Sequence, residues 1–211
     1  MIRPKIIIGL IFFFIYFIQL IDGQGISKTG KKDGTAIFKR AVNIPQGNYH
    51  IKNVKTKKYL TFVQPGTLVQ PNSKKKSKQT IWNTLRYKNK LYSFNHNNGN
   101  LKKCISSRWT NGRNDAAVLW QAQLKYKKNN KRGLTRRYDP ILPEKQVWVL
   151  VPVAKRKNTY KIIAYSHLYD MIPTCISSQS TGGHTSRGGT VLKKCKYNTN
   201  DSSLYWTFEK A

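Results

Sequence analysis

The chain has 211 residues, of which 39 are lysine or arginine and 8 are aspartate or glutamate, so its formal net charge is +31 at pH 7. This length fits one domain with a full hydrophobic core, and after the first residues no apolar stretch is long enough to cross a membrane. So strong a positive charge attracts polyanions such as sulfated glycans, anionic lipid surfaces, sialylated surfaces and nucleic acid. Composition bias is the alternative source of the charge, because lysine, asparagine and isoleucine are all frequent.

Residues 1–23 predict a secretory signal peptide. Arg3 and Lys5 form a short positive region, residues 6–18 are continuously apolar, and Gly23 suits the last position before cleavage. The apolar run is shorter than the ~20 residues that a membrane-spanning helix needs. We therefore expect a secreted protein, with an uncleaved amino-terminal anchor as the alternative. Residues 24–45 are interpreted as a linker and residues 46–211 as the folded domain.

The folded domain contains a threefold repeat. Residues 104–107 and residues 175–178 both read Cys-Ile-Ser-Ser, and each is followed, after a polar stretch, by a Val-Leu pair. Residues 58–62, Lys-Tyr-Leu-Thr-Phe, take the same place in a weaker first copy. The three copies end on aromatic residues, namely Trp82, Trp148 and Trp206.

The local pattern of the repeats predicts strands. Residues 49–54, 90–94 and 159–163 alternate in polarity, are rich in β-branched or aromatic residues, and lie next to turn-forming clusters. No segment of ten or more residues combines helical periodicity with good caps. The predicted fold class is all-β.

Three repeats with aromatic ends resemble the ricin B-type lectins, whose repeats carry a Gln-x-Trp signature. Gln146, Val147 and Trp148 match that signature, whereas Thr80 and Leu204 replace the glutamine in the other two copies. The resemblance covers about residues 46–210 and implies a β-trefoil with lobes at approximately 46–88, 89–153 and 154–211. It also implies a carbohydrate-binding module without an active site.

The resemblance further implies a disulfide bond. In ricin-like lobes, the first cysteine pairs with a cysteine three residues after the leucine of the second element, and Cys175 and Cys195 hold these places. The partner place of Cys104 is occupied by Ala122. Cys104 is therefore expected to be a buried free thiol, with an intermolecular bridge as the alternative.

Sugar binding in this family combines a carboxylate two places after the first cysteine with an aromatic residue that stacks on the sugar ring. Trp120 holds the stacking place of the second lobe, but the carboxylate places hold Ser106 and Ser177. Stacking buries the apolar face of the ring, and Trp120 could instead be a core residue. The expected carbohydrate-binding residues are Trp120, Ser106, Gln146 and Lys145.

Two basic clusters form a second functional signal. The first follows residue 73, and the second lies in residues 123–145, a stretch much longer than the usual connection and interpreted as a loop inserted outside the core. Such loops bind phosphate or sulfate groups through their accumulated charge. The expected polyanion-binding residues are Lys74, Lys75, Lys76, Lys78, Lys127, Lys128, Lys131, Arg132, Arg136 and Arg137.

Signals of catalysis are weak. The four histidines lack metal-ligand spacing, the few acidic residues form no obvious pair, and no glycine-rich phosphate loop precedes a helix. No catalytic residue, metal or cofactor is predicted. The first hypothesis is a secreted lectin-like protein that binds glycans on another cell's surface, possible roles being adhesin or effector. The alternative is a trefoil that holds sulfated glycosaminoglycan or nucleic acid by charge after its sugar pockets have decayed, and a structural role in an extracellular coat is a third reading.

Overall fold

The computed structural model describes residues 28–62, 70–98, 101–107, 115–121, 124–126, 132–134, 143–168, 173–178 and 190–211. The expected signal peptide, residues 1–23, lies outside these ranges. Within them, no helix has the length and apolar character that a membrane span requires.

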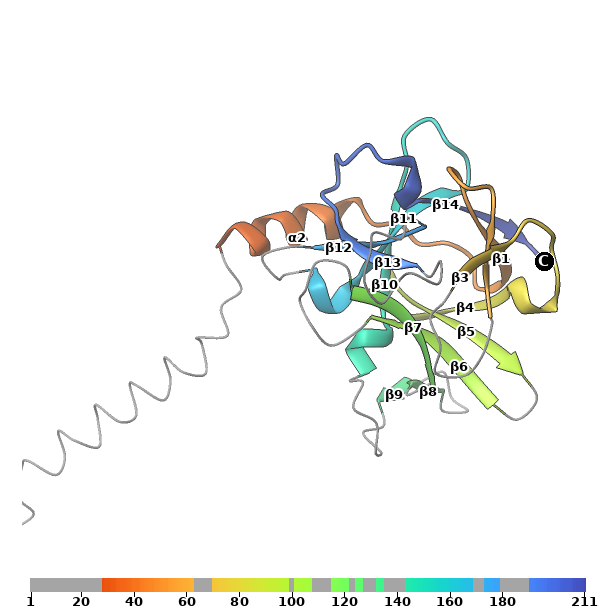
Figure 1. The fold of residues 1–211 in the computed structure, drawn as a ribbon. Coiled ribbons are helices and arrows are strands. Elements are labelled where there is room, and N and C mark those ends of the chain that lie inside the picture. The colour runs from red at the N-terminus through yellow and green to blue at the C-terminus, as the bar shows by residue number, and fades with distance from the viewer. Residues whose placement is uncertain are drawn as a thin grey trace, which may run out of the picture.

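Six of the described strands close into an antiparallel barrel (Figure 1). The barrel strands are β1 (Gly47–Asn53), β4 (Ile81–Lys88), β5 (Leu91–Asn98), β10 (Trp148–Pro152), β11 (Thr159–Ala164) and β14 (Tyr205–Lys210). β1 pairs with β4, β4 with β5, β5 with β10, β10 with β11, β11 with β14, and β14 again with β1. Inward and outward side chains alternate along a barrel strand, which explains the alternating burial along β4.

Three hairpins accompany the barrel. They are β2 (Tyr59–Thr61) with β3 (Gln70–Ser73), β6 (Leu101–Ser107) with β7 (Asp115–Gln121), and β12 (Thr174–Ser177) with β13 (Val191–Lys194). Each hairpin lies in the chain between two barrel strands, so the order strand, hairpin, strand occurs three times. This order is that of a β-trefoil, and the all-β prediction is confirmed.

The three tryptophans at the repeat ends hold equivalent places in the core. Each is fully buried and lies opposite a tyrosine of the neighbouring barrel strand: Trp82 opposite Tyr49, Trp148 opposite Tyr92, and Trp206 opposite Tyr160. Each indole Nε1 donates a hydrogen bond to a hairpin carbonyl, at 3.0 Å to Leu60, 3.0 Å to Ile105 and 2.9 Å to Ile176. Ile105 and Ile176 are the second residues of the two Cys-Ile-Ser-Ser motifs, and Leu60 is the third residue of the stretch 58–62. The equivalent hydrogen bonds therefore align Tyr59 of the weaker first copy with Cys104 and Cys175.

Short 3-10 helices mark the same repeat. η1 (Lys78–Thr80), η2 (Pro143–Gln146) and η5 (Ser202–Leu204) end at or just before the strands that carry the three tryptophans. A further one, η3 (Tyr165–His167), follows β11.

An α-helix corrects the expectation that no helix occurs. α2 (Lys28–Arg40) lies at one side of the trefoil (Figure 1), within the stretch interpreted as a linker. Gly34 and Ile37 are buried, and their spacing of three residues places them on one face of the helix; Ala41, directly after the helix, is buried as well. The Val42 amide then donates a hydrogen bond to the Leu150 carbonyl of β10 at 3.0 Å. The residues just before β1 are therefore a packed part of the domain.

The long insertion contains ordered backbone pairing of its own. β8 (Leu124–Tyr126) and β9 (Arg132–Leu134) form a separate two-stranded antiparallel sheet. They make no ladder with the barrel or hairpin strands among the described residues. The stretch is thus partly a hairpin, where the sequence predicted only a loop.

The predicted disulfide bond is confirmed. Cys175 and Cys195 are linked, with Cα atoms 5.7 Å apart and a separation of 20 positions in the sequence. Cys104 is a free thiol and is 1% exposed, as expected for a cysteine whose partner place holds alanine.

Candidate functional site

The family's carboxylate position carries a buried hydroxyl group in every lobe. Thr61, Ser106 and Ser177 hold it and are 9%, 0% and 0% exposed. Thr61 Oγ1 donates to the Tyr59 carbonyl at 2.9 Å, Ser106 Oγ lies 3.8 Å from Cys104 Sγ, and Ser177 Oγ lies 3.1 Å from Ser203 Oγ. These hydroxyl groups have partners inside the protein, so they are not available to bind the hydroxyl edge of a sugar.

Two of the predicted sugar-binding residues lie inside the fold. Ser106 and Gln146 have no exposed surface. Lys145 is partly exposed, and its carbonyl accepts a hydrogen bond from Ser107 Oγ at 3.1 Å. Trp120 lies in β7 opposite Cys104, but only its backbone is described, so its stacking role stays a prediction.

The first predicted basic cluster lies on the surface. Lys74, Lys75, Lys76 and Lys78 follow β3 and are all exposed. Lys76 Nζ contacts Glu209 Oε2 of β14 at 3.1 Å, whereas no ion pair among the described residues involves the other three. Three cations of this cluster are thus available to an anionic ligand.

Most of the second predicted cluster lies outside the described residues. This applies to Lys127, Lys128, Lys131, Arg136 and Arg137, and only the backbone of Arg132 is described, in β9. Their role in polyanion binding remains a prediction.

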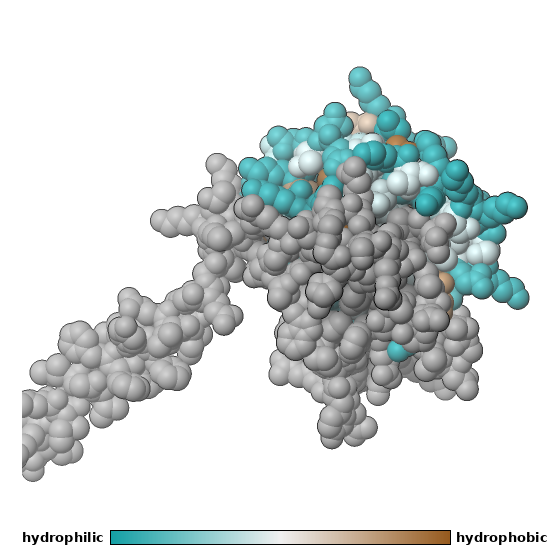
Figure 2. Space-filling view, viewed as in Figure 1, coloured by the Kyte–Doolittle hydropathy of each residue, from teal (hydrophilic) through white to brown (hydrophobic). Residues whose placement is uncertain are grey.

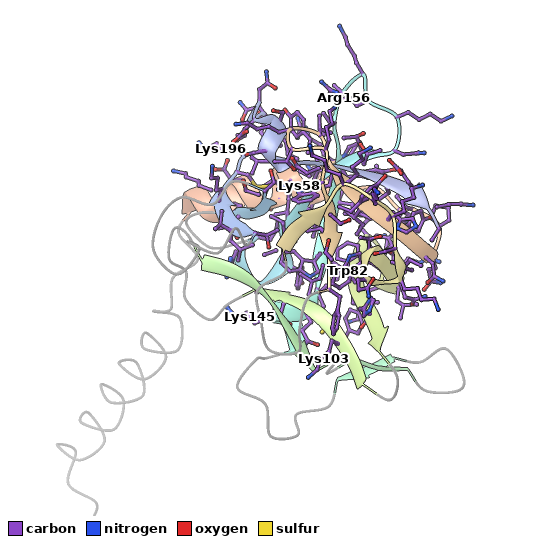
Figure 3. All side chains as sticks on the ribbon, turned by 45° about the vertical axis from the view of Figure 1, so that its right-hand side comes forward. Lys58, Trp82, Lys103, Lys145, Arg156 and Lys196 are labelled. Atoms are coloured by element: carbon purple, nitrogen blue, oxygen red, sulfur yellow. A yellow bond between two sulfur atoms is a disulfide. The ribbon has the colours of Figure 1, made fainter. Side chains whose placement is uncertain are left out.

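Positive charge is poorly compensated across the described part of the surface. The described residues contain two salt bridges, Lys76–Glu209 and Lys196–Asp33, the second at 3.8 Å. Hydrophilic residues cover most of the described face in Figure 2. In Figure 3, Lys103, Lys145, Arg156 and Lys196 lie at the periphery, whereas Trp82 lies within the fold.

A pocket near one end of the barrel combines aromatic rings with polar groups. It has a volume of about 520 Å³ and lies between β1, β11, β14 and the turn before β11. Its rings come from Tyr49, Tyr160 and Phe208, and the Tyr160 and Phe208 rings meet edge to face with centroids 5.4 Å apart. The polar residues are Lys157, Asn158, Thr207, Glu209 and Lys210. We call this cavity the axial pocket.

The charges of the axial pocket are fixed by its surroundings. Burial, followed by the neighbouring Tyr49 and Tyr92, raises the pKa of Tyr160, so its hydroxyl group stays protonated and can donate a hydrogen bond. Burial opposes ionisation of Glu209, but hydrogen bonds from Lys76 and Tyr59 outweigh it and lower the pKa of the carboxyl group. Because Glu209 lines the pocket and binds Lys76, the axial pocket and the first basic cluster are contiguous.

The described histidines serve the fold. His50 Nδ1 lies 2.8 Å from Thr80 Oγ1, His96 Nδ1 lies 2.9 Å from the Ile81 carbonyl, and His167 Nδ1 lies 2.6 Å from Thr174 Oγ1. The described residues contain no group of three or more metal-ligating side chains.

We expect His167 to make the folded protein less stable at acid pH. Burial, followed by the charge of Lys145, lowers its pKa from 6.5 to about 4, and its Nε2 atom is buried without a partner. Between these two pKa values, His167 is therefore protonated in the unfolded chain but neutral in the folded chain. As the pH falls from 6.5 toward 4, this residue should remove up to about 3 kcal/mol of the free energy of unfolding.

Denaturant unfolding measured between neutral pH and about pH 5, above the range where carboxylates titrate, tests this expectation. The lowered pKa of His50 adds a contribution of the same sign, so the His167→Gln variant is the necessary reference. Its free energy of unfolding should fall less steeply with pH than that of the parent chain. Equal slopes would show that folding does not lower the pKa of His167.

Comparison with known proteins supports the fold. No family model matches the chain, and no curated protein matches it. ThreeFoil, a designed 3-fold symmetric protein, is 14% identical over 78% of this chain and 99% of its own, with a TM-score of 0.54. An exo-beta-1,3-galactanase from Clostridium thermocellum is 10% identical with a TM-score of 0.54, over 81% of this chain and 31% of its own.

Lectins are also among the similar structures. A ricin B-like lectin from Macrolepiota procera, in complex with lactose, is 13% identical over 81% of this chain and 100% of its own, with a TM-score of 0.49. At these identities the similarity shows the β-trefoil fold alone.

Proposed function

We propose that this protein is a non-catalytic carbohydrate-binding β-trefoil that recognises acidic glycans. The axial pocket carries the proposal, because it places the partly exposed Tyr160 ring beside Lys157 and Lys210. Through Glu209 it is linked to the exposed Lys74–Lys78 cluster. A sugar presents apolar C–H groups to a ring, and its sulfate or carboxylate groups attract nearby ammonium groups. The resemblance to ricin B-type lectins supports a carbohydrate as the ligand.

The same proposal includes the place where the protein acts. A signal peptide over residues 1–23 would send the chain to the cell exterior, where acidic glycans coat cell surfaces. A disulfide bond is also typical of secreted proteins. We propose an adhesin or effector that binds the glycans of another cell.

Charge removal from the first basic cluster should weaken glycan binding. The triple variant Lys74→Gln, Lys75→Gln, Lys78→Gln removes three exposed cations without disturbing a described side-chain contact. We expect about tenfold weaker binding of sulfated glycans at low salt and a smaller loss at high salt, because surface charges are screened. A glycan array read at both salt concentrations, followed by titration of the best ligand, measures this.

A matched control separates local contacts from total charge. The variant Lys88→Gln, Lys155→Gln, Lys194→Gln also loses three exposed lysines, none of which lines the axial pocket. An equal loss in both variants, or tighter binding to nucleic acid than to any glycan, would contradict the proposal. In the same assay, Trp120→Ala tests the second lobe: a large loss there with no change on Tyr160→Phe would move the sugar site from the axial pocket to β7.

A further inference from the structure

A second cavity lies on the third lobe, separate from the axial pocket. It has a volume of about 570 Å³ and is bounded by the end of α2, the β10–β11 turn, residues 197–200 and Tyr205. Its charged lining residues are Arg40, Lys161 and Arg156, and it contains no aspartate or glutamate. Three cations thus face one cavity without a carboxylate among the lining residues.

Lys161 is the buried cation of this cavity. It is 4% exposed, and its Nζ atom donates hydrogen bonds to the carbonyls of Tyr197 at 2.7 Å and Lys196 at 3.2 Å. An ammonium group has three donors, so these two bonds leave one. Burial lowers the pKa of Lys161, because removing a charge from water without a counter-ion disfavours the charged form.

The two arginines complete the positive cavity. Arg40, at the end of α2, lies with its guanidinium carbon 4.0 Å from the centroid of the Tyr197 ring, and its Nη1 atom donates to the Ala36 carbonyl at 3.2 Å. A guanidinium group has five donors, so most of them remain for a ligand. Arg156 is exposed in the β10–β11 turn and lies at the periphery in Figure 3.

Nearby acidic residues are engaged elsewhere. Asp33 of α2 contacts Lys196 at 3.8 Å, and Asp201 Oδ1 accepts a hydrogen bond from the Ser203 amide at 2.9 Å. The wall formed by residues 197–200 is held in shape, because the Tyr205 hydroxyl donates to Asn200 Oδ1 at 2.8 Å and the Lys196 amide donates to Thr199 Oγ1 at 2.8 Å. The cavity is therefore built before a ligand arrives.

We infer that this cavity binds a sulfate or phosphate group carried on a sugar, held by Arg40, Arg156 and the buried ammonium of Lys161. A tetrahedral anion accepts several hydrogen bonds at once, and guanidinium groups match its geometry. The volume exceeds that of one such group and leaves room for the ring that carries it. The choice of a sugar rests on the proposed function, whereas the binding of the anion itself does not.

The position of the cavity agrees with an extended acidic ligand. The turn between β10 and β11 separates the two cavities, since Arg156 lines this one and Lys157 lines the axial pocket. One chain of sulfated sugars could therefore contact both cavities across the turn. Its affinity would then exceed that of either site alone.

The test compares two single-charge variants of the full chain. Arg156→Gln removes a cavity cation whose side chain forms no salt bridge among the described residues, and Lys155→Gln removes the adjacent exposed cation, which does not line the cavity. The probes are inorganic sulfate, inorganic phosphate, galactose 6-sulfate, galactose 6-phosphate and galactose, titrated by calorimetry at constant ionic strength. We expect about a tenfold loss of binding of the charged probes in Arg156→Gln and less than about twofold in Lys155→Gln.

The outcomes distinguish the site from the proposed function. Charged sugars binding more tightly than the inorganic ions supports a sulfated or phosphorylated glycan, and equal binding of inorganic ions supports a free-anion site. A glycan array without any bound glycan would contradict the proposed function only. Binding of the charged probes to this cavity would still support the anion site. Equal losses in both variants, or binding of galactose as tight as that of its esters, would overturn the inference.

Discussion

Trp206→Ala is expected to lower the free energy of unfolding by about 3–5 kcal/mol, which is a large part of the roughly 5–15 kcal/mol that stabilises an ordinary domain. Trp206 is 0% exposed, and it lies in β14, the strand that closes the barrel between β1 and β11. Alanine would leave a cavity there and would remove the donor that binds the Ile176 carbonyl. Denaturant unfolding monitored by circular dichroism measures the loss.

Trp206→Phe separates the two contributions. Phenylalanine retains an aromatic ring but cannot donate the hydrogen bond to Ile176, so it should lose less than alanine, about 1–3 kcal/mol. Trp82→Ala and Trp148→Ala should behave like Trp206→Ala, because their burial and hydrogen bonds are equivalent. A small loss at one of the three positions would show that the threefold symmetry of the core does not extend to its energetics.

The repeat could be predicted from the sequence because its physical signals are local. A tryptophan at the end of each copy and the Cys-Ile-Ser-Ser motif each occupy a fixed position relative to a hairpin, and the structure places them in equivalent contacts. The Cys175–Cys195 bridge followed from the same alignment. An insertion such as residues 123–145 changes the spacing of the copies without changing those contacts.

α2 could not be predicted, because its buried face carries little hydrophobic signal. Gly34 and Ile37 are buried, as is Ala41 directly after the helix, and of these three only Ile37 is a large apolar residue. Two glycines within residues 28–40 also lower the helix propensity of this segment. The helix is thus stabilised by its contacts with the trefoil, including the neighbouring core residues, which no local pattern displays.

The sequence could not decide between a binding role and a core role for Ser106, because a serine fits both a binding pocket and a core. Ser106 stands at the place of a ligand-binding carboxylate, yet it is buried with Cys104 as its neighbour. The axial pocket escaped prediction for another reason. It combines residues 44–49, 157–160 and 207–210, which only the closure of the barrel brings together.

Loss of the Cys175–Cys195 bridge is the second large expected effect. The bridge spans 20 residues, and cross-linking a loop of that size restricts the unfolded chain by roughly 3 kcal/mol in the chain-entropy model. The double variant Cys175→Ala, Cys195→Ala should lose this amount and, in addition, the packing of two fully buried side chains. Denaturant unfolding under non-reducing conditions measures the total.

Cys104→Ala is the matched control, because Cys104 holds the place of Cys175 in the second lobe and is buried without a bridge. It reports the cost of removing one buried sulfur, and twice that cost subtracted from the loss in the double variant isolates the cross-link. A non-reduced peptide map should recover Cys175 linked to Cys195, with Cys104 alkylated only after denaturation. A Cys104–Cys195 link would overturn the equivalence of the lobes. The double variant could instead lose no more free energy of unfolding than twice the loss in Cys104→Ala. That result would show that the segments of β12 and β13 are already restrained in the unfolded chain, because the covalent bond would then add no further restraint.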